Sequence, residues 1–336
     1  MYNEEVNTMR KTASKAFSKV YGSIAAYTVI SIALVYILEI ATAILLGSDR
    51  FLALSENVYF IWAIQVVSMY LVAFPLLLLF VRKLPSAKRE SSSMSPKEFF
   101  YIFLVSEAVM LLGSFISGII TDIFGRLLGH EIVDTTSDLI EKTPIWIIIL
   151  VAVVIGPIVE EMIFRKIAID KLSIYGDRLA VIVSAVAFGV FHGNFYQLFY
   201  ATAFGLILGY VYTRTRKSIY NCLLHMAINF MGTIPALLTQ DALDRLQALP
   251  EDAVIEGTLI NDYYVVMGVS ALQYALAGLG VWVFIEATRN RAYHLTNSCD
   301  VELPRSELPR VCLLNFGVII FLIISVGQCI LSLFLT

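Results

Sequence analysis

Long apolar segments recur along the chain and alternate with short polar ones. The stretch 57–81 contains no charged residue, and a helix needs about 20 mostly apolar residues to cross a bilayer. The fifth and sixth segments are short and are separated only by Gly193 and Asn194, so we expect a tight hairpin there. The pattern predicts an all-α, polytopic transmembrane bundle of eight or nine spanning helices. The nine segments are 21–47, 58–81, 99–121, 144–164, 179–193, 195–213, 218–236, 263–287 and 311–334.

The composition supports a membrane protein. Apolar residues make up 58% and charged residues 15% of the chain, and the mean hydropathy is +0.78. About a quarter of the residues of soluble domains are charged, so this chain has too few polar residues to cover one soluble globule. The net charge of −3 provides no basic surface for nucleic acid. We therefore expect contact with the lipid bilayer and no nucleic-acid partner.

The basic residues are sorted between alternate segments. Twenty of the 24 Lys and Arg residues fall in five segments that nine crossings place on one side. The positive-inside rule then places the N-terminus in the cytosol and the C-terminus outside. We expect a cytosolic segment, 1–20, followed by a single membrane domain, 21–336. Because we find no targeting or retention signal, we expect a bacterial plasma membrane. The basic segments are 1–20, 82–98, 165–178, 214–217 and 289–310.

Ionisable residues inside a spanning helix are costly and mark functional candidates. Glu160 and Glu161 end the fourth segment, and Arg165 follows one turn later. Adjacent helical residues point in different directions, whereas Glu161 and Arg165, at i and i+4, can pair on one face. Glu160 would then lack a close counter-charge and could transfer protons. The alternative is a cytosolic helix end that carries surface acids.

Two of the four histidines fall within later apolar segments. The motifs Phe188-x-x-x-His192 and His225-x-x-x-Asn229 each place two side chains at i and i+4, on one helix face. A single histidine in an apolar helix can also be a hydrogen-bonded core residue. The order of an acidic pair, a histidine and a His–Asn pair in successive membrane segments favours one joint site.

These three motifs resemble the signature motifs of the CPBP (CaaX protease and bacteriocin-processing, Abi) family of intramembrane proteases. The family includes the type II CaaX prenyl endopeptidases and bacterial bacteriocin-processing and self-immunity proteins. The similarity covers 144–236, which we expect to be the catalytic core. It implies a membrane-embedded enzyme whose substrate is a peptide or a lipidated protein.

The resemblance also implies a role for each motif residue. Glu160, together with His192, would activate a water molecule for attack on a peptide carbonyl. His225 and Asn229 would stabilise the oxyanion of the tetrahedral intermediate. The supporting residues would be Glu161, Arg165 and Phe188.

The same resemblance leaves the use of a metal open. Glu160, His192 and His225 could hold Zn²⁺ as a cofactor with a free coordination position. The sequence lacks an H-E-x-x-H motif, and the three groups can also activate water without a metal. Both mechanisms stay open at this point.

The predicted topology places two of the proposed site residues at different depths in the membrane. Helical rise places Glu160 about 6–8 Å and His192 about 20 Å from the cytosolic surface, although a joint site needs them close together. Helix tilt, a kink at Pro157 or a different start of the fifth helix would close this gap. We predict that Glu160, His192, His225 and Asn229 surround one cavity.

The predicted function is cleavage of a CaaX-like tail, a leader peptide or a membrane-anchored peptide, with access from the cytosol. Two alternatives belong to other classes. A proton-coupled transporter could use Glu39, Glu107 and Glu160 with the histidines as a proton relay. A non-catalytic immunity or scaffold protein could share the fold without turnover.

Overall fold

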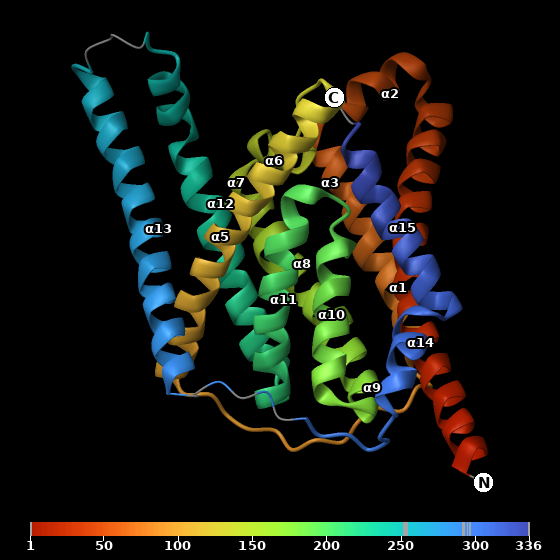
Figure 1. The fold of residues 1–336 in the computed structure, drawn as a ribbon. Helices are drawn as coiled ribbons and strands as arrows, with labels where there is room; N and C mark the ends of the chain where they lie inside the picture. The colour runs from red at the N-terminus through yellow and green to blue at the C-terminus, as the bar shows by residue number, and fades with distance from the viewer. Residues whose placement is uncertain (1, 251–254, 291–292, 294, 296, 335–336) are drawn as a thin grey trace.

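The computed structural model describes residues 2–250, 255–290, 293, 295 and 297–334. All regular secondary structure in these residues is helical, and the long helices form one bundle (Figure 1). Seven helices are long and apolar enough to cross a membrane, and the bent pair α14–α15 would make eight. The predicted fold class is confirmed, but the described residues do not provide a ninth span.

The first helix begins earlier than predicted. α1 runs over Tyr2–Leu46, so residues 2–20 are the first part of this helix. Ala13, Phe17 and Val20 are buried in the core, at the spacing of one helix face. Their burial explains why the helix extends through a sequence rich in polar residues.

The second and third spans follow. α2 (Ser48–Ser55) is a short connection, and the second span consists of α3 (Val58–Val66), the π-helical η1 (Val67–Ala73) and α4 (Phe74–Val81). The third span is α5 (Pro96–Leu128). Ser95 caps α5 by accepting a hydrogen bond from the backbone N–H of Glu98, which is the Ser-x-x-Glu pattern of a capping box. The short helix α6 (Thr135–Glu141) lies at the end of the bundle where α5 finishes (Figure 1).

The fourth span is longer than predicted, and its winding changes along its length. Two π-helical stretches, η2 and η3, flank the short α-helix that carries the acidic pair. The predicted end at 164 is wrong, because the helical path continues to Tyr175. Arg165 is buried within the bundle rather than in a cytosolic loop. The elements are α7 (Ile145–Ile148), η2 (Ile149–Ile155), α8 (Gly156–Glu161), η3 (Met162–Ile169), α9 (Asp170–Leu172) and η4 (Ser173–Tyr175).

The fifth and sixth segments form the predicted hairpin, from α10 (Asp177–Phe191) and α11 (Phe195–Thr215). Gly193 turns the chain with a φ of +68°, a conformation that glycine adopts readily. α10 has 15 residues and is about 22 Å long, which is shorter than the hydrocarbon core of a bilayer, about 30 Å. The apex of the hairpin lies below the end of the bundle that carries α2 and α6 (Figure 1).

The remaining helices complete the bundle. α12 (Ser218–Gln247) and α13 (Thr258–Arg289) are long, and α13 packs against α5. The turn η5 (Arg305–Glu307) precedes α14 (Leu308–Leu313), which meets α15 (Phe316–Ser332) at 58°. α15 packs along α1 (Figure 1).

Charged contacts join several of the predicted basic segments at one end of the bundle. Arg216 lies 2.6 Å from Asp177, and Arg89 lies 2.8 Å from Asp300. The hydroxyl of Ser92 donates a hydrogen bond to the carbonyl of Arg214. The segments that follow α4, α11 and α13 therefore meet at the end where α1 begins (Figure 1).

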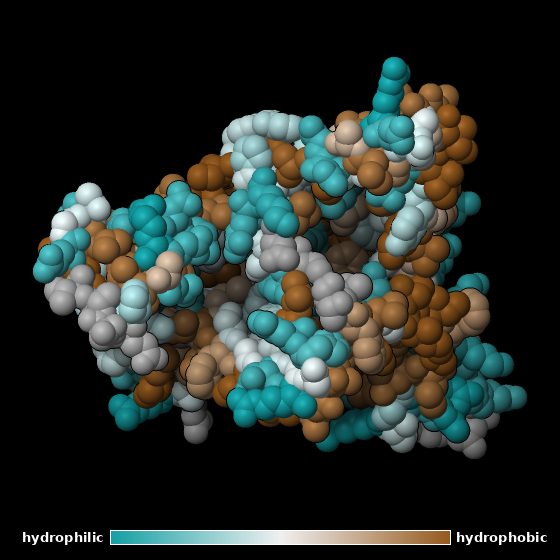
Figure 2. Space-filling view, turned by 90° about the horizontal axis from the view of Figure 1, so that it is seen from above, coloured by the Kyte–Doolittle hydropathy of each residue, from teal (hydrophilic) through white to brown (hydrophobic). Residues whose placement is uncertain are grey.

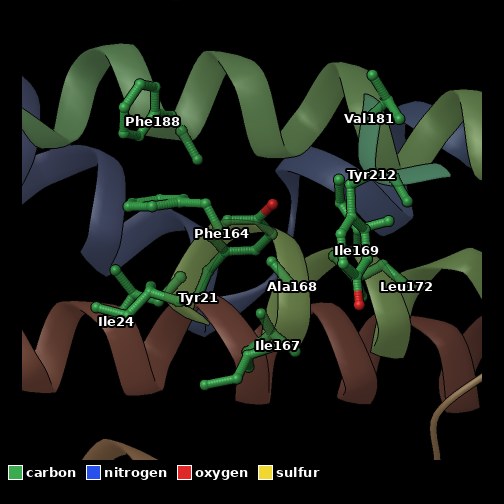
Figure 3. Packing of buried hydrophobic residues seen from close by; sticks show 14 of the residues in the cluster. Tyr21, Ile24, Phe164, Ile167, Ala168, Ile169, Leu172, Val181, Phe188 and Tyr212 are labelled. Atoms are coloured by element: carbon green, nitrogen blue, oxygen red, sulfur yellow. The ribbon is translucent and has the colours of Figure 1, made fainter. Parts of the chain in front are cut away.

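Aromatic and aliphatic side chains pack together in the core beside the fourth span (Figure 3). Phe164 of η3 lies between Phe188 of α10 and Tyr21 of α1. The ring centroids of Phe164 and Phe188 are 5.2 Å apart. This packing fixes the fourth span against α10 and holds Phe188 beside the polar residues described next.

Candidate active site

One cavity of about 410 Å³ brings the predicted site residues together. Glu160, His192, His225 and Asn229 all line it, and so does Phe188. The prediction of a shared cavity is confirmed. The predicted difference in depth between Glu160 and His192 arose from the boundary of the fourth span. This span continues to Tyr175, so Glu160 lies near its middle rather than at its end.

The two adjacent acids have different surroundings. The side chain of Glu160 is 25% exposed and faces the cavity, whereas that of Glu161 is fully buried. Arg165 Nη1 lies 3.3 Å from Glu161 Oε1, and both side chains are buried. The predicted i,i+4 pair is confirmed. The alternative of surface acids at a cytosolic helix end is wrong.

Arg165 links the acidic pair to the aromatic core. Its guanidinium lies 4.4 Å from the centre of the Phe188 ring, a distance typical of a cation–π contact. Its Nη2 donates a long hydrogen bond, 3.5 Å, to the carbonyl of Gly205 in α11. A charge at this depth is tolerated because Glu161 neutralises it and the ring and carbonyl solvate it.

His225 lies between the two acids. Its Nδ1 is 2.9 Å from Glu161 Oε1, and its Nε2 is 3.6 Å from Glu160 Oε2. A carboxylate can only accept, so Nδ1 carries the hydrogen of the shorter contact. The Nε2 atom therefore faces Glu160. The sequence predicts the Glu161–Arg165 contact but not the contact between Glu161 and His225, because the partners are on different helices.

His192 is held by its own helix. It follows the last residue of α10, and its Nδ1 lies 2.7 Å from the carbonyl oxygen of Phe188. A carbonyl can only accept, so Nδ1 is the donor and the neutral ring has its lone pair at Nε2. The Phe188 ring meets His192 edge-on at 4.8 Å and His225 at 5.7 Å. Phe188 thus orients both imidazoles, consistent with its predicted supporting position.

Asn229 has a backbone partner that the motif does not predict. Its Nδ2 donates to the carbonyl of Ala152 at 2.9 Å. In an α-helix this carbonyl would accept from the N–H of Gly156, but that N–H bonds to Val151 in the π-helical winding. The next residue is Pro157, which has no N–H. Asn229 therefore satisfies a carbonyl that the π-helix and the proline leave without an intrahelical donor.

The three predicted metal ligands, Glu160, His192 and His225, all line the cavity. In the part of the chain that the structure describes, no three or more His, Cys, Asp or Glu side chains are grouped so as to hold a metal ion. Glu160 and His225 are close, and the Nδ1 contacts of His192 and His225 leave the Nε2 atom of each ring free, as in metal-ligating histidines. Because the three side chains are not grouped around one position, the described residues do not fit a three-ligand zinc site.

Further cavity residues carry weak sequence signals or none. Gln65 and Gln197 are polar residues in apolar segments, and both line the cavity. Tyr70 and Tyr200 also line it, but tyrosine is common in membrane helices. Only the glutamines could have been singled out from the sequence, because an amide is unusual in a spanning helix.

The fold and this cavity define an integral membrane protein with ionisable groups gathered inside a helical bundle. Residues 142–231 match the Rce1-like family of type II CAAX prenyl endopeptidases. The resemblance predicted from the three motifs is confirmed. The matched family and both relatives are named as membrane proteases or peptidases.

Two curated relatives are similar to parts of the chain. The membrane-embedded CAAX protease MroQ of Staphylococcus aureus is 28% identical over 194 residues, which cover 54% of this chain and 76% of the relative. The putative membrane peptidase YdiL of Bacillus subtilis is 32% identical over 121 residues, which cover 34% of this chain and 47% of the relative. The matched region therefore spans about three quarters of one relative and about half of the other. No solved structure is significantly similar to the chain.

Proposed function

We propose that the protein is an intramembrane endopeptidase in which Glu160 activates the attacking water. The observation that carries this proposal is the shared cavity, where Glu160 and two histidines meet inside an apolar bundle. Ionisable groups are rarely placed there without a function. The peptidase names of both relatives support peptide-bond hydrolysis as the reaction.

The first half of the proposed reaction uses Glu160 and His192, which both line the cavity. The Glu160 carboxylate takes a proton from water as the water oxygen attacks the peptide carbonyl carbon. The neutral Nε2 of His192 accepts a hydrogen bond from the same water and orients it. The attack forms a tetrahedral intermediate with a negative oxygen.

The second half uses His225 and Asn229. While Nδ1 of His225 keeps its hydrogen bond to Glu161, a proton at Nε2 lets the ring donate to the oxyanion. The amide of Asn229 keeps one N–H for the same oxygen, because Ala152 takes only the other. The C–N bond then breaks, and Glu160 returns its proton to the leaving nitrogen. This closes the cycle without a group from outside the chain except water.

The proposed setting is a bacterial plasma membrane with a cytosolic N-terminus. Both relatives come from bacteria, and the positive-inside rule supports a cytosolic position for the end of the bundle that carries the basic segments. The proposed substrates are a CaaX-like tail, a leader peptide or a membrane-anchored peptide. The next subsection narrows this choice.

The transporter alternative is less consistent with the cavity. Neither Glu39 nor Glu107 is among the described residues that line it with Glu160, so these three acids do not form one relay. The scaffold alternative differs from the enzyme only in that a scaffold would not cleave peptides.

The test compares peptides released from membranes of cells that express wild type or Glu160→Ala at equal levels. Peptides that require Glu160 support the protease, and identical peptide sets would contradict it.

A further inference from the structure

The cavity of the candidate active site extends toward the end of the bundle opposite the basic segments. Its lining includes Trp62, close to the start of the second span, and Thr136 and Ile140 of α6. Both elements lie at the upper end of the bundle in Figure 1. Seen from that end, the molecule has a hollow in its centre (Figure 2). Among the described residues, none of those lining the cavity comes from the five basic segments.

The other end of the cavity is closed by packed side chains. Phe164, Leu208 and Tyr212 are completely buried below the site. Closer to the basic end, the hydroxyl of Tyr212 donates a hydrogen bond to Asp170, and Arg216 lies 2.6 Å from Asp177. These contacts tie the fourth, fifth and sixth segments together at the basic end. The described residues therefore leave a peptide no comparable route to Glu160 from that side.

The walls of the cavity are nearly uncharged. Among the described lining residues, Glu160 is the only carboxylate, and none is Lys or Arg. The walls are formed by aromatic and apolar side chains, with single amides and hydroxyls between them. An enclosed charge needs a partner, so a peptide segment bound here carries no charged side chain of its own inside the cavity.

The basic end marks the cytosolic side, because membrane proteins retain Lys and Arg in cytosolic loops. The opening near α6 then faces away from the cytosol. We infer that the site receives an uncharged peptide segment from the non-cytosolic side of the membrane. This inference rests on the proposed protease function and narrows its substrates to exported or membrane-anchored peptides exposed on that side. It replaces the expected cytosolic access, and it disfavours a cytosolic CaaX-like tail.

A labelling experiment tests the direction of the opening without requiring activity. Cys299 is an exposed, free cysteine at the basic end, whereas the other three cysteines are buried. Wild type and the double variant Cys299→Ser, Thr136→Cys each present one accessible thiol, at opposite ends. Intact spheroplasts are treated with a membrane-impermeant maleimide, before or after permeabilisation. We expect Thr136→Cys to react in intact spheroplasts and Cys299 only after permeabilisation. The reverse pattern would overturn the inference.

Mapping the cleaved bonds separates this inference from the function on which it rests. Peptides that depend on Glu160 are identified by mass spectrometry, and the membrane side of each cut bond is read from the topology of its parent protein. Cuts in uncharged segments on the non-cytosolic side support the inference. Cuts in cytosolic tails would show that the protein is a protease but that the access route is wrong. If no peptide depends on Glu160, the function fails, and the labelling still decides the direction of the opening.

Discussion

Glu161 Oε1 lies 2.9 Å from His225 Nδ1, and this contact joins the fourth span to α12. The same oxygen lies 3.3 Å from Arg165 Nη1. The buried acid therefore has two partners, one that neutralises it and one that it orients. Its neighbour Glu160 is left to face the cavity. The two acids therefore have different roles. Glu161 fixes the positions of Arg165 and His225, and Glu160 is accessible to substrate.

Removing the charge of Glu161 should destabilise the protein and also impair catalysis. Glu161→Gln keeps the shape but leaves the buried Arg165 without a counter-charge, which costs about 3–5 kcal/mol. We expect a lower melting temperature in detergent micelles and a lower kcat. The double variant Glu161→Gln, Arg165→Met removes both charges and should recover much of the stability. Its kcat should remain low, because His225 still lacks a carboxylate. Full recovery of kcat would show that Glu161 has only a structural role.

Glu160→Gln should impair catalysis without destabilising the protein. The Glu160 side chain is partly exposed to the cavity, and the substitution leaves the Glu161–Arg165 pair intact. We expect a melting temperature close to that of wild type and a loss of kcat of about 10²–10⁴-fold, the usual contribution of a general base. Both quantities are measured on the same purified sample. A variant that melts normally and cleaves at the wild-type rate would rule out Glu160 as the base.

Asn229→Ala should lower both stability and turnover, for separate reasons. It leaves the carbonyl of Ala152 without a donor, which costs about 1–3 kcal/mol, and it removes a proposed oxyanion donor. Asn221 on the same helix offers a matched control, since its Nδ2 donates to the buried carbonyl of Leu208 at 2.6 Å. Asn221→Ala should cost similar stability while kcat is maintained. Equal losses of kcat in the two variants would show that Asn229 acts only through the fold.

Chelation tests the zinc prediction. The described residues do not group Glu160, His192 and His225 as three ligands, and the proposed steps need only their proton transfers and hydrogen bonds. We therefore expect purified protein to keep its cleavage rate after dialysis against a chelator. The metal content of the dialysed sample is measured alongside the rate. Loss of activity that returns on addition of Zn²⁺ would contradict the expectation and would restore the metal mechanism.

The local parts of the fold and site could be predicted because they depend on residues close in sequence. The apolar runs predict the helices, and the i,i+4 spacing predicts the pairing of Glu161 with Arg165. The predicted helix boundaries were wrong where polar stretches contain residues that are buried in the bundle. The burial of Phe17 explains why a polar stretch belongs to α1. Arg165 is charged, so the sequence suggested that the fourth span ends before it, whereas the span continues to Tyr175.

Contacts between helices could not be predicted in the same way. The hydrogen bond from Asn229 to Ala152 depends on π-helical winding before Pro157, and that winding has no periodic signature in the sequence. The contact between His225 and Glu161 depends on how α12 packs against the fourth span. The motifs indicate which residues belong to the site, but packing decides which residues meet.

Filling the cavity at Gly232 should hinder substrate binding without replacing any of the proposed catalytic groups. Gly232 lines the cavity, and a Cβ atom built there meets no other heavy atom within 4 Å. Gly268 in α13 is equally open but is not among the described lining residues. We expect Gly232→Leu to lower kcat/KM by about tenfold or more, which corresponds to at least about 1.4 kcal/mol of lost transition-state stabilisation. Gly268→Leu should change it less than twofold, and both variants should melt near wild type. Equal effects of the two substitutions, or an unchanged rate with Gly232→Leu, would show that substrates do not pass this point.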